Sequence, residues 1–120
     1  MKVLIVDDSE LMRKRLSEMI SQVEGVEIVG KAERSQEAIE AIQKLKPNVV
    51  ILDIKMPGGN GIGVLEHIKK NNTNTKVIMF TNYPYPQYRK KCMDLGADYF
   101  FDKSTEFEEV VEVLRGLLKC

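Results

Sequence analysis

The sequence contains no tryptophan, only two cysteines and a single histidine, and it has no net charge. Because the 18 basic residues balance the 18 acidic ones, no bulk field draws the chain to nucleic acid or to an acidic membrane surface. Cys92 and Cys120 do not have the spacing of a metal-binding pair, and without a signal sequence they indicate a reducing cytoplasm. No apolar run reaches the roughly 18 residues that a membrane-spanning helix requires.

Internal repeats, low-complexity tracts and Pro- or Ser-rich linkers are also missing. A chain of 120 residues can bury roughly two-thirds of the surface that its unfolded form exposes, so it should fold without disulfides or metals. We therefore expect residues 1–120 to form a single domain. The only histidine, His67, is expected on a helix surface, away from any reactive site.

Short apolar runs alternate with helical patterns five times along the chain. The runs predict strands at residues 2–6, 26–32, 49–52, 76–80 and 99–101. Apolar residues recur at helical spacing in the five segments that follow them, the first over residues 9–23 and the last from Thr105 onward. Strands that alternate with helices in this way predict an α/β fold, in which a parallel sheet has helices on both faces.

Three helix starts have recognisable capping residues. Ser35 is expected to cap the second helix, and Thr105 with Glu108 has the pattern of a capping box for the last helix. Asp8 is a candidate cap for the first helix. Residues 58–63 are rich in glycine but lack the Gly-Lys-Ser/Thr ending of a phosphate-binding loop, so we interpret them as a turn.

The predicted strands end in side chains that could share one site. Asp7 and Asp8 follow the first strand, Asp53 follows the third, Thr81 the fourth and Lys103 the fifth. In parallel sheets, ligands bind outside the carboxyl ends of the strands. Crowded carboxylates repel one another unless a cation lies between them, and magnesium suits such oxygen ligands where phosphate is involved. With a lysine and a hydroxyl to hold an oxyanion, the set predicts a site that accepts a phosphoryl group on a carboxylate.

Each of these residues has a simpler explanation when it is taken alone. An aspartate at a strand end is about three times more often a cap or a solvated terminus than a reactive group. Thr81 alone is typical of a loop hydroxyl, and Lys103 alone is typical of a solvated lysine. Three acids and a lysine at one edge of the same sheet reverse this preference.

Five short motifs follow one another along the chain. They are Val-Asp-Asp-Ser at 6–9, Leu-Asp-Ile-Lys-Met-Pro-Gly at 52–58, Asn-Gly-Ile at 60–62, Phe-Thr-Asn at 80–82 and Leu-Gly-Ala-Asp-Tyr-Phe-Phe-Asp-Lys at 95–103. In this order and spacing they resemble the receiver domain of two-component response regulators, over the whole chain. The resemblance implies a flavodoxin-like, doubly wound (βα)5 fold, with a five-stranded parallel sheet in the strand order 2-1-3-4-5.

The resemblance also implies a role for each site residue. Asp53 would be the phosphoacceptor, and Mg²⁺ would bind to Asp8, to the Asp53 carboxylate and to the backbone carbonyl of Lys55. Asp7 would act mainly through a coordinated water, and Lys103 would bridge to the phosphoryl oxygens. The phosphoryl group would come in line from a phosphohistidine on a histidine kinase or phosphotransfer protein.

A switch is implied by the same resemblance. Thr81 would donate its hydroxyl to the phosphoryl group and move inward, because that group adds about −1.5 to −2 of charge and three strong acceptors. Phe100 would rotate into the vacated space and change the face of the fourth helix, fifth strand and fifth helix, where an output protein binds. The basic run 89–91 borders that face and is either a solvated surface or a means of selecting an acidic partner.

Several positions depart from the common family pattern. Ser104 stands after Lys103 where the family usually has a proline, so a looser lysine loop and a trans peptide are expected. Asn82 stands where the family usually has a small residue and is expected to narrow access to the phosphoryl group. Lys55 and Tyr83 flank the path of attacking water and are expected to change the lifetime of the phosphorylated state.

Four functional hypotheses follow, and the fourth, a degenerate receiver that never takes phosphate, does not lead because the chain keeps too many of the site residues. The first is a phosphorylation-controlled switch that binds a partner protein and is not an enzyme, with phosphorylation-dependent dimerisation left open. The second is the receiver half of a DNA-binding transcriptional regulator truncated at Cys120. The third, an aspartate-nucleophile phosphatase, needs Asp-x-Asp after the first strand, which residues 7–9 do not supply. We expect this domain itself to contact neither nucleic acid nor a membrane.

Overall fold

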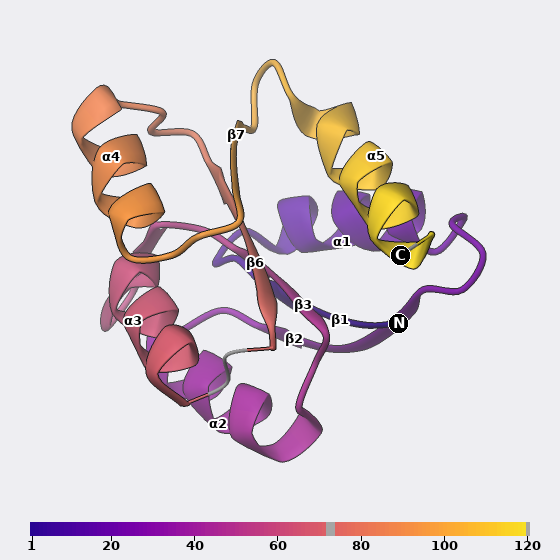
Figure 1. Ribbon diagram of the computed structural model, residues 1–120, viewed down its shortest axis with the longest axis horizontal. Helices are drawn as coiled ribbons and strands as arrows, with labels where there is room; N and C mark the ends of the chain where they lie inside the picture. Colours follow the sequence, from indigo (N-terminus) through magenta and orange to yellow (C-terminus); the bar gives the residue numbers. More distant parts are fainter. Residues whose placement is uncertain (72–73, 120) are drawn as a thin grey trace.

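A five-stranded parallel sheet runs through the middle of the computed structural model, which describes residues 1–71 and 74–119 (Figure 1). Its strands, β1 (Lys2–Val6), β2 (Glu27–Ala32), β3 (Val49–Leu52), β6 (Lys76–Thr81) and β7 (Tyr99–Asp102), lie in the order β2-β1-β3-β6-β7. Every neighbouring pair is parallel. Since β6 and β7 are the fourth and fifth strands of this sheet, the predicted flavodoxin-like order 2-1-3-4-5 is confirmed.

Within the described residues, five helices cover the sheet on both sides (Figure 1). α1 (Glu10–Ile20) and α5 (Phe107–Leu118) pack on one face, and α2 (Ser35–Leu45), α3 (Gly61–Asn71) and α4 (Pro86–Asp94) pack on the other. None of these helices is long and apolar enough to cross a membrane. Cys120, one of the two cysteines, lies outside the described residues.

Alternation along the strands divides the buried side chains into two cores. Val3 and Ile5 of β1 pack with α1 and α5, whereas Leu4 and Val6 pack with the three helices on the other face. All four side chains are at most 1% exposed. Because both faces of the central strands are covered, their sequences are continuous apolar runs.

The three predicted helix caps are each wrong by one residue. The N-cap residues of α1, α2 and α5 are Ser9, Arg34 and Glu106, rather than Asp8, Ser35 and Thr105. Ser9 caps with its side chain, since its Oγ accepts the Met12 N–H at 3.2 Å. The Glu106 carboxylate instead accepts the Asp102 N–H at 3.1 Å. The N-cap residues of α2 and α5 therefore make no side-chain capping hydrogen bond with their own helices.

A two-stranded hairpin joins β3 to α3. Its strands, β4 (Lys55–Met56) and β5 (Gly59–Asn60), are antiparallel. Gly58 at the tip has a φ of 77°, in the left-handed region that favours glycine. The segment 58–63, predicted to be a turn, is thus the tip and second strand of a hairpin followed by the start of α3. Two-residue strands are too short to give a periodic signal, which is why the sequence did not indicate them.

The end of the sheet opposite the strand-terminal acids is held by Asp98, which precedes β7. Its Oδ2 accepts the Val77 N–H and a hydrogen bond from the Lys69 ammonium, both at 2.9 Å. Its Oδ1 lies 3.7 Å from the Lys76 ammonium. Lys69 also donates to the Thr75 carbonyl at 3.1 Å. One carboxylate therefore ties α3 to the starts of β6 and β7.

Asp98→Ala is expected to lower the free energy of unfolding by about 2 kcal/mol, because it takes the acceptor away from the Val77 N–H and the Lys69 ammonium. Urea unfolding followed by circular dichroism measures the change. Asp94→Ala is the matched control, since it removes an exposed carboxylate whose contact with Lys90 lies on the surface of α4. A loss no larger than that of the control would contradict the structural role of Asp98.

Candidate functional site

The carboxyl ends of four strands bring the predicted site residues to one edge of the sheet. Asp7 follows β1, Asp53 follows β3 and Lys103 follows β7, while Thr81 is the last residue of β6. Hydrogen bonds continue past the strand ends. The Asp53 N–H donates to the Val6 carbonyl at 3.0 Å, and the Lys103 N–H donates to the Thr81 carbonyl at 2.9 Å. The backbone of the site is therefore an extension of the sheet.

Lys103 lies between two carboxylates. Its Nζ is 2.5 Å from Asp7 Oδ2 and 3.1 Å from Asp53 Oδ2. The three side chains are 2–6% exposed, so their charges interact more strongly than they would in water. Asp53 Oδ1 accepts the Ile54 N–H at 2.8 Å, and Asp7 Oδ1 accepts the Ser9 N–H at 2.9 Å. In each buried carboxylate, one oxygen thus accepts a backbone N–H and the other pairs with the Lys103 ammonium.

Burial raises the pKa of the Asp53 carboxyl from 3.8 to about 6. Removal from water is the largest cause, and repulsion by Asp7 acts in the same direction. The Lys103 ammonium and the Ile54 N–H oppose the rise without cancelling it. The folded site therefore disfavours the charged form of Asp53, and a cation beside this carboxylate would offset that cost.

The acids lie close enough together to share one cation. One carboxylate oxygen from each of Asp7, Asp8 and Asp53 lies within 4.8 Å of the others. Asp8 is exposed, and together with Lys55 it lines an open hollow of about 470 Å³ beside the β4–β5 hairpin. An open group of carboxylates suits Mg²⁺, which prefers oxygen ligands and keeps several waters. The predicted acidic cluster is therefore present, and the donor set fits the predicted metal.

Thr81 and Lys55 both contact the start of the loop between β6 and α4. Thr81 is fully buried, and its Oγ1 accepts the Tyr83 N–H at 2.9 Å. The Lys55 ammonium lies 5.1 Å from the centre of the Tyr83 ring and 6.0 Å from that of Tyr88, within the range of cation–π attraction. Lys55 and Tyr83, which were predicted together to flank the path of attacking water, are thus in contact. Tyr88 also contacts Lys55, which the sequence did not indicate.

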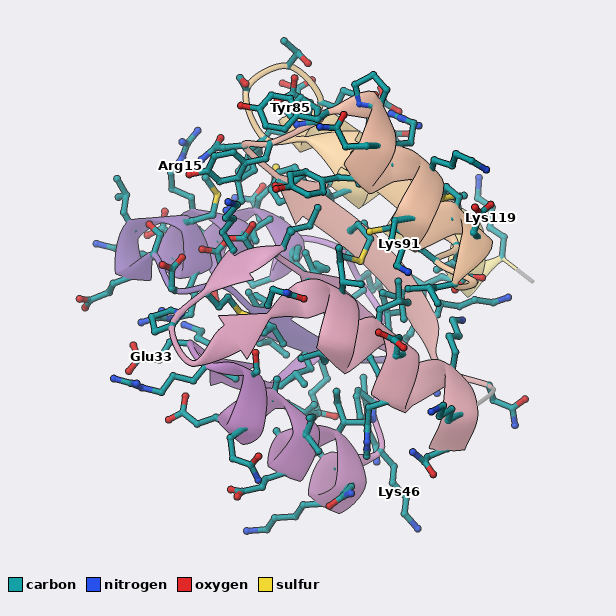
Figure 2. The ribbon with its side chains drawn as sticks, turned by 90° about the vertical axis from the view of Figure 1, so that its left-hand side faces the viewer. Arg15, Glu33, Lys46, Tyr85, Lys91 and Lys119 are labelled. Atoms are coloured by element: carbon teal, nitrogen blue, oxygen red, sulfur yellow. The ribbon has the colours of Figure 1, made fainter. Side chains whose placement is uncertain are left out.

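Phe100 is buried beside α4 with 3% of its surface exposed. The Arg89 guanidinium lies 4.9 Å from its ring centre, and Arg89 Nη2 donates to the Phe100 carbonyl at 3.3 Å. Lys90 pairs with Asp94 at 3.0 Å. Lys91 projects from α4 (Figure 2). Arg89 thus reaches β7 and Lys90 is paired on the helix surface, while all three residues of the run 89–91 are exposed.

Arg13 of α1 is a neighbour of the site that the sequence analysis missed. Its Nη1 donates to the Asp7 backbone carbonyl at 2.7 Å, and its Nη2 lies 3.7 Å from Glu33 Oε2. Arg13 therefore supports the backbone that carries Asp7. The sequence shows it only as one of several basic residues on a polar helix face, and that pattern does not distinguish a support from a solvated side chain.

The Lys103–Ser104 peptide is trans as predicted, and no described peptide is cis. The loop expected to be loose after this lysine is closed by hydrogen bonds. Asp102 Oδ1 accepts both the N–H and the hydroxyl of Ser104, at 2.9 and 2.7 Å. The absence of proline at this position is therefore accompanied by a different constraint on the turn.

Comparison with known proteins places this geometry in a family. Residues 3–115 match the response regulator receiver domain. The response regulator GacA of Pseudomonas aeruginosa is 32% identical over 114 residues, which are 95% of this chain and 53% of GacA. The chain spans about half the length of the curated relatives that it matches first.

Two solved structures share the fold over nearly the whole chain. The response regulator domain of Thermotoga maritima CheB is 33% identical, with a TM-score of 0.86 over 99% of this chain and 93% of that one. A chain of the CheX-CheY-BeF3-Mg+2 complex from Borrelia burgdorferi is 32% identical, with a TM-score of 0.82 over 94% of this chain and 88% of that one. Fold and sequence agree, and the chain therefore belongs to the receiver domains of two-component response regulators.

Proposed function

We propose that Asp53 accepts a phosphoryl group from a phosphohistidine of a histidine kinase or phosphotransfer protein. The observation that carries this proposal is the pairing of Lys103 with Asp53 inside the acidic cluster. An Asp53 carboxylate oxygen attacks phosphorus in line as the bond from phosphorus to the histidine nitrogen breaks. The product is an acyl phosphate on Asp53, and the histidine nitrogen leaves with its electron pair. Lys103 Nζ lies 3.1 Å from Asp53 Oδ2. Its ammonium would therefore donate charge-assisted hydrogen bonds to the phosphoryl oxygens.

Mg²⁺ is part of this proposal. Asp8, Asp53 and the backbone carbonyl of Lys55 would hold the ion, and Asp7 would act through a coordinated water. When bound, the ion neutralises charge on the phosphoryl oxygens. Support comes from the three carboxylates within 4.8 Å and from the raised pKa of Asp53. The similar Borrelia burgdorferi structure has BeF3 and Mg+2 in its name.

Phosphorylation is proposed to act on a partner through α4, β7 and α5. Thr81 would donate its hydroxyl to the new phosphoryl group, whereas its oxygen now accepts the Tyr83 N–H. Movement of Thr81 would pull the loop that leads to α4. It would also open space for Phe100, which is already buried beside that helix. An output protein would read the changed face.

Residues 1–120 are proposed to act as one receiver domain, a phosphoacceptor in the cytoplasm rather than an enzyme beyond its own phosphotransfer and dephosphorylation. A second candidate is the receiver half of a longer transcriptional regulator. It is favoured by the curated relatives, of which this chain spans about half the length. Coding sequence that continues past Cys120 into a DNA-binding domain would favour the second candidate.

The test is incubation with acetyl phosphate and Mg²⁺, followed by intact mass measurement. The wild type is expected to gain the mass of one phosphoryl group, and Asp53→Asn is expected to gain none, because its amide is not a nucleophile for phosphorus. Asp94→Asn makes the same change on an exposed carboxylate of α4 and should be phosphorylated like the wild type. No gain in the wild type, or an equal gain in Asp53→Asn, would refute the assignment.

A further inference from the structure

Lys103 reaches its two carboxylates from a turn that follows β7. The last residue of that strand, Asp102, pairs with Thr81 of β6. The Lys103 N–H then donates to the Thr81 carbonyl at 2.9 Å, which fixes the chain before the lysine. After the lysine comes an exposed Ser104, where the resemblance to receiver domains leads one to expect the rigid ring of a proline. Some other contact must fix the direction of the chain there.

Hydrogen bonds of Asp102 supply that contact. Its Oδ1 accepts the N–H and the hydroxyl of Ser104, at 2.9 and 2.7 Å. Its backbone carbonyl accepts the Glu106 N–H at 2.8 Å, and its N–H donates to Glu106 Oε1 at 3.1 Å. Lys103 lies inside the turn that these bonds close. The side chain of Asp102 is thus bonded directly to the residue that follows the lysine.

The acceptor in this turn is a charged group. The Ser104 hydroxyl and N–H hold the pKa of the Asp102 carboxyl below its ordinary value. Asp102 is therefore ionised at neutral pH, and hydrogen bonds to an ionised acceptor are shorter and stronger than those between neutral groups. Because the Asp102 carboxylate accepts the N–H of the residue two positions later, this segment is an Asx turn, and an apolar side chain at position 102 would supply no acceptor for it.

We propose that Asp102, with Ser104 as its donor, positions Lys103 for phosphoryl transfer. This inference rests on the proposed function and adds a residue to it. Asp102 touches neither the acceptor nor the phosphoryl group, so it acts through the backbone of the lysine and is a positioning residue. The alternative is a turn that serves only to begin α5. The two differ in whether Asp102 still matters once the Lys103 ammonium is gone.

The first test is the initial rate of phosphorylation of the full chain by acetyl phosphate at saturating Mg²⁺. Asp102→Ala is expected to lower this rate about 10-fold, because a displacement of about 1 Å in a positioning group has effects of this size or larger. Asp102→Asn keeps an acceptor oxygen for the turn and is expected to stay within about 3-fold of the wild type. Ser104→Ala removes one of the two donors to Asp102, and its phosphorylation rate should fall between those of Asp102→Ala and Asp102→Asn. Asp94→Ala should have no effect.

A double-mutant cycle separates positioning from folding. Lys103→Met removes the ammonium and is expected to give the lowest phosphorylation rate among the single variants. If Asp102 acts through Lys103, adding Asp102→Ala to Lys103→Met lowers the rate no further. A further loss as large as that of Asp102→Ala alone would overturn the inference. Wild-type rates for both Asp102→Ala and Ser104→Ala would overturn it as well.

A second measurement does not depend on phosphorylation. Held by two buried carboxylates, the Lys103 ammonium should give a side-chain ¹⁵N–¹H NMR signal that exchanges slowly with water. Asp102→Ala should lose this protection and Asp102→Asn should keep it. If Asp102→Ala does not fold, Ser104→Ala should show weakened protection, and full protection there would overturn the inference. A wild type that takes up no phosphoryl group refutes the proposed function, while this signal still decides whether Asp102 orients Lys103.

Discussion

Gly61→Ala is expected to lower the free energy of unfolding by about 3 kcal/mol and to reduce phosphoryl uptake at Asp53. Gly61 is the first residue of α3, and its N–H donates to the Ile54 carbonyl at 2.7 Å. A Cβ on Gly61 would overlap the Asp53 carbonyl oxygen and lie 2.9 Å from the carbonyl carbon. Because both contacts are with backbone, no side-chain movement relieves them. Either α3 or the segment that carries the acceptor must shift.

Gly63→Ala is the matched control for this prediction. It makes the same substitution two residues later in α3, where no atom lies within 4 Å of the added Cβ. There the better helix propensity of alanine is expected to raise stability by up to about 1 kcal/mol. Urea unfolding measures both variants, and intact mass after acetyl phosphate measures uptake. If the two variants were equally stable, the start of α3 would be free to move and the close approach to Asp53 would have no role.

Most of the fold follows from apolar patterns in the sequence. The runs at 2–6 and 49–52 are apolar almost throughout because β1 and β3 are covered on both faces, and a buried parallel strand leaves no polar side to alternate with. β2 lies at the edge of the sheet, and only one of its six residues is buried, which explains the weaker pattern at 26–32. The strand order came from the resemblance, since the pattern gives the number of strands and not their neighbours.

The helix ends and the hairpin could not be predicted from the sequence, for a physical reason. Ser35 has the right chemistry for a cap, but it is the first residue of α2, and its hydroxyl donates to the Asn60 carbonyl of the hairpin at 3.4 Å. Glu106 likewise uses its carboxylate on Asp102. In both cases the side chain has a partner outside its own helix, which a local capping motif does not take into account.

The sequence brought the site residues to one edge but did not indicate how they pair. Lys103 lies nearer to Asp7 than to Asp53, which depends on the turn from which it reaches the site. Lys55 lies over the ring of Tyr83, and this contact depends on how the β4–β5 hairpin packs against the loop before α4. The roles assigned to these residues stay predictions, whereas the acidic cluster itself is present.

Asp53→Asn is expected to be more stable than the wild type at pH 8 without divalent metal, by up to about 3 kcal/mol. The pKa of Asp53 is about 6 in the folded chain, against 3.8 for an ordinary aspartate. Its protonated form is therefore favoured by folding. The stability that the protonated Asp53 carboxyl contributes to the folded state is fully present below pH 3.8, falls as the pH rises and is lost above about pH 6. At pH 8 the buried carboxylate beside Asp7 opposes folding, whereas asparagine carries no charge and keeps an oxygen for the Ile54 N–H.

Unfolding measured from pH 4 to pH 8 tests this sign. The stability gap between Asp53→Asn and the wild type should widen from pH 4 to about pH 6 and then stay constant, while Asp94→Asn should show no such gap. Mg²⁺ should narrow it, since an ion at 100 times its dissociation constant stabilises the folded wild type by about 2.7 kcal/mol. The variant lacks one carboxylate of the cluster and should gain less. A gap independent of pH, or equal stabilisation of both proteins by Mg²⁺, would mean that Asp53 is not the charge that the metal neutralises.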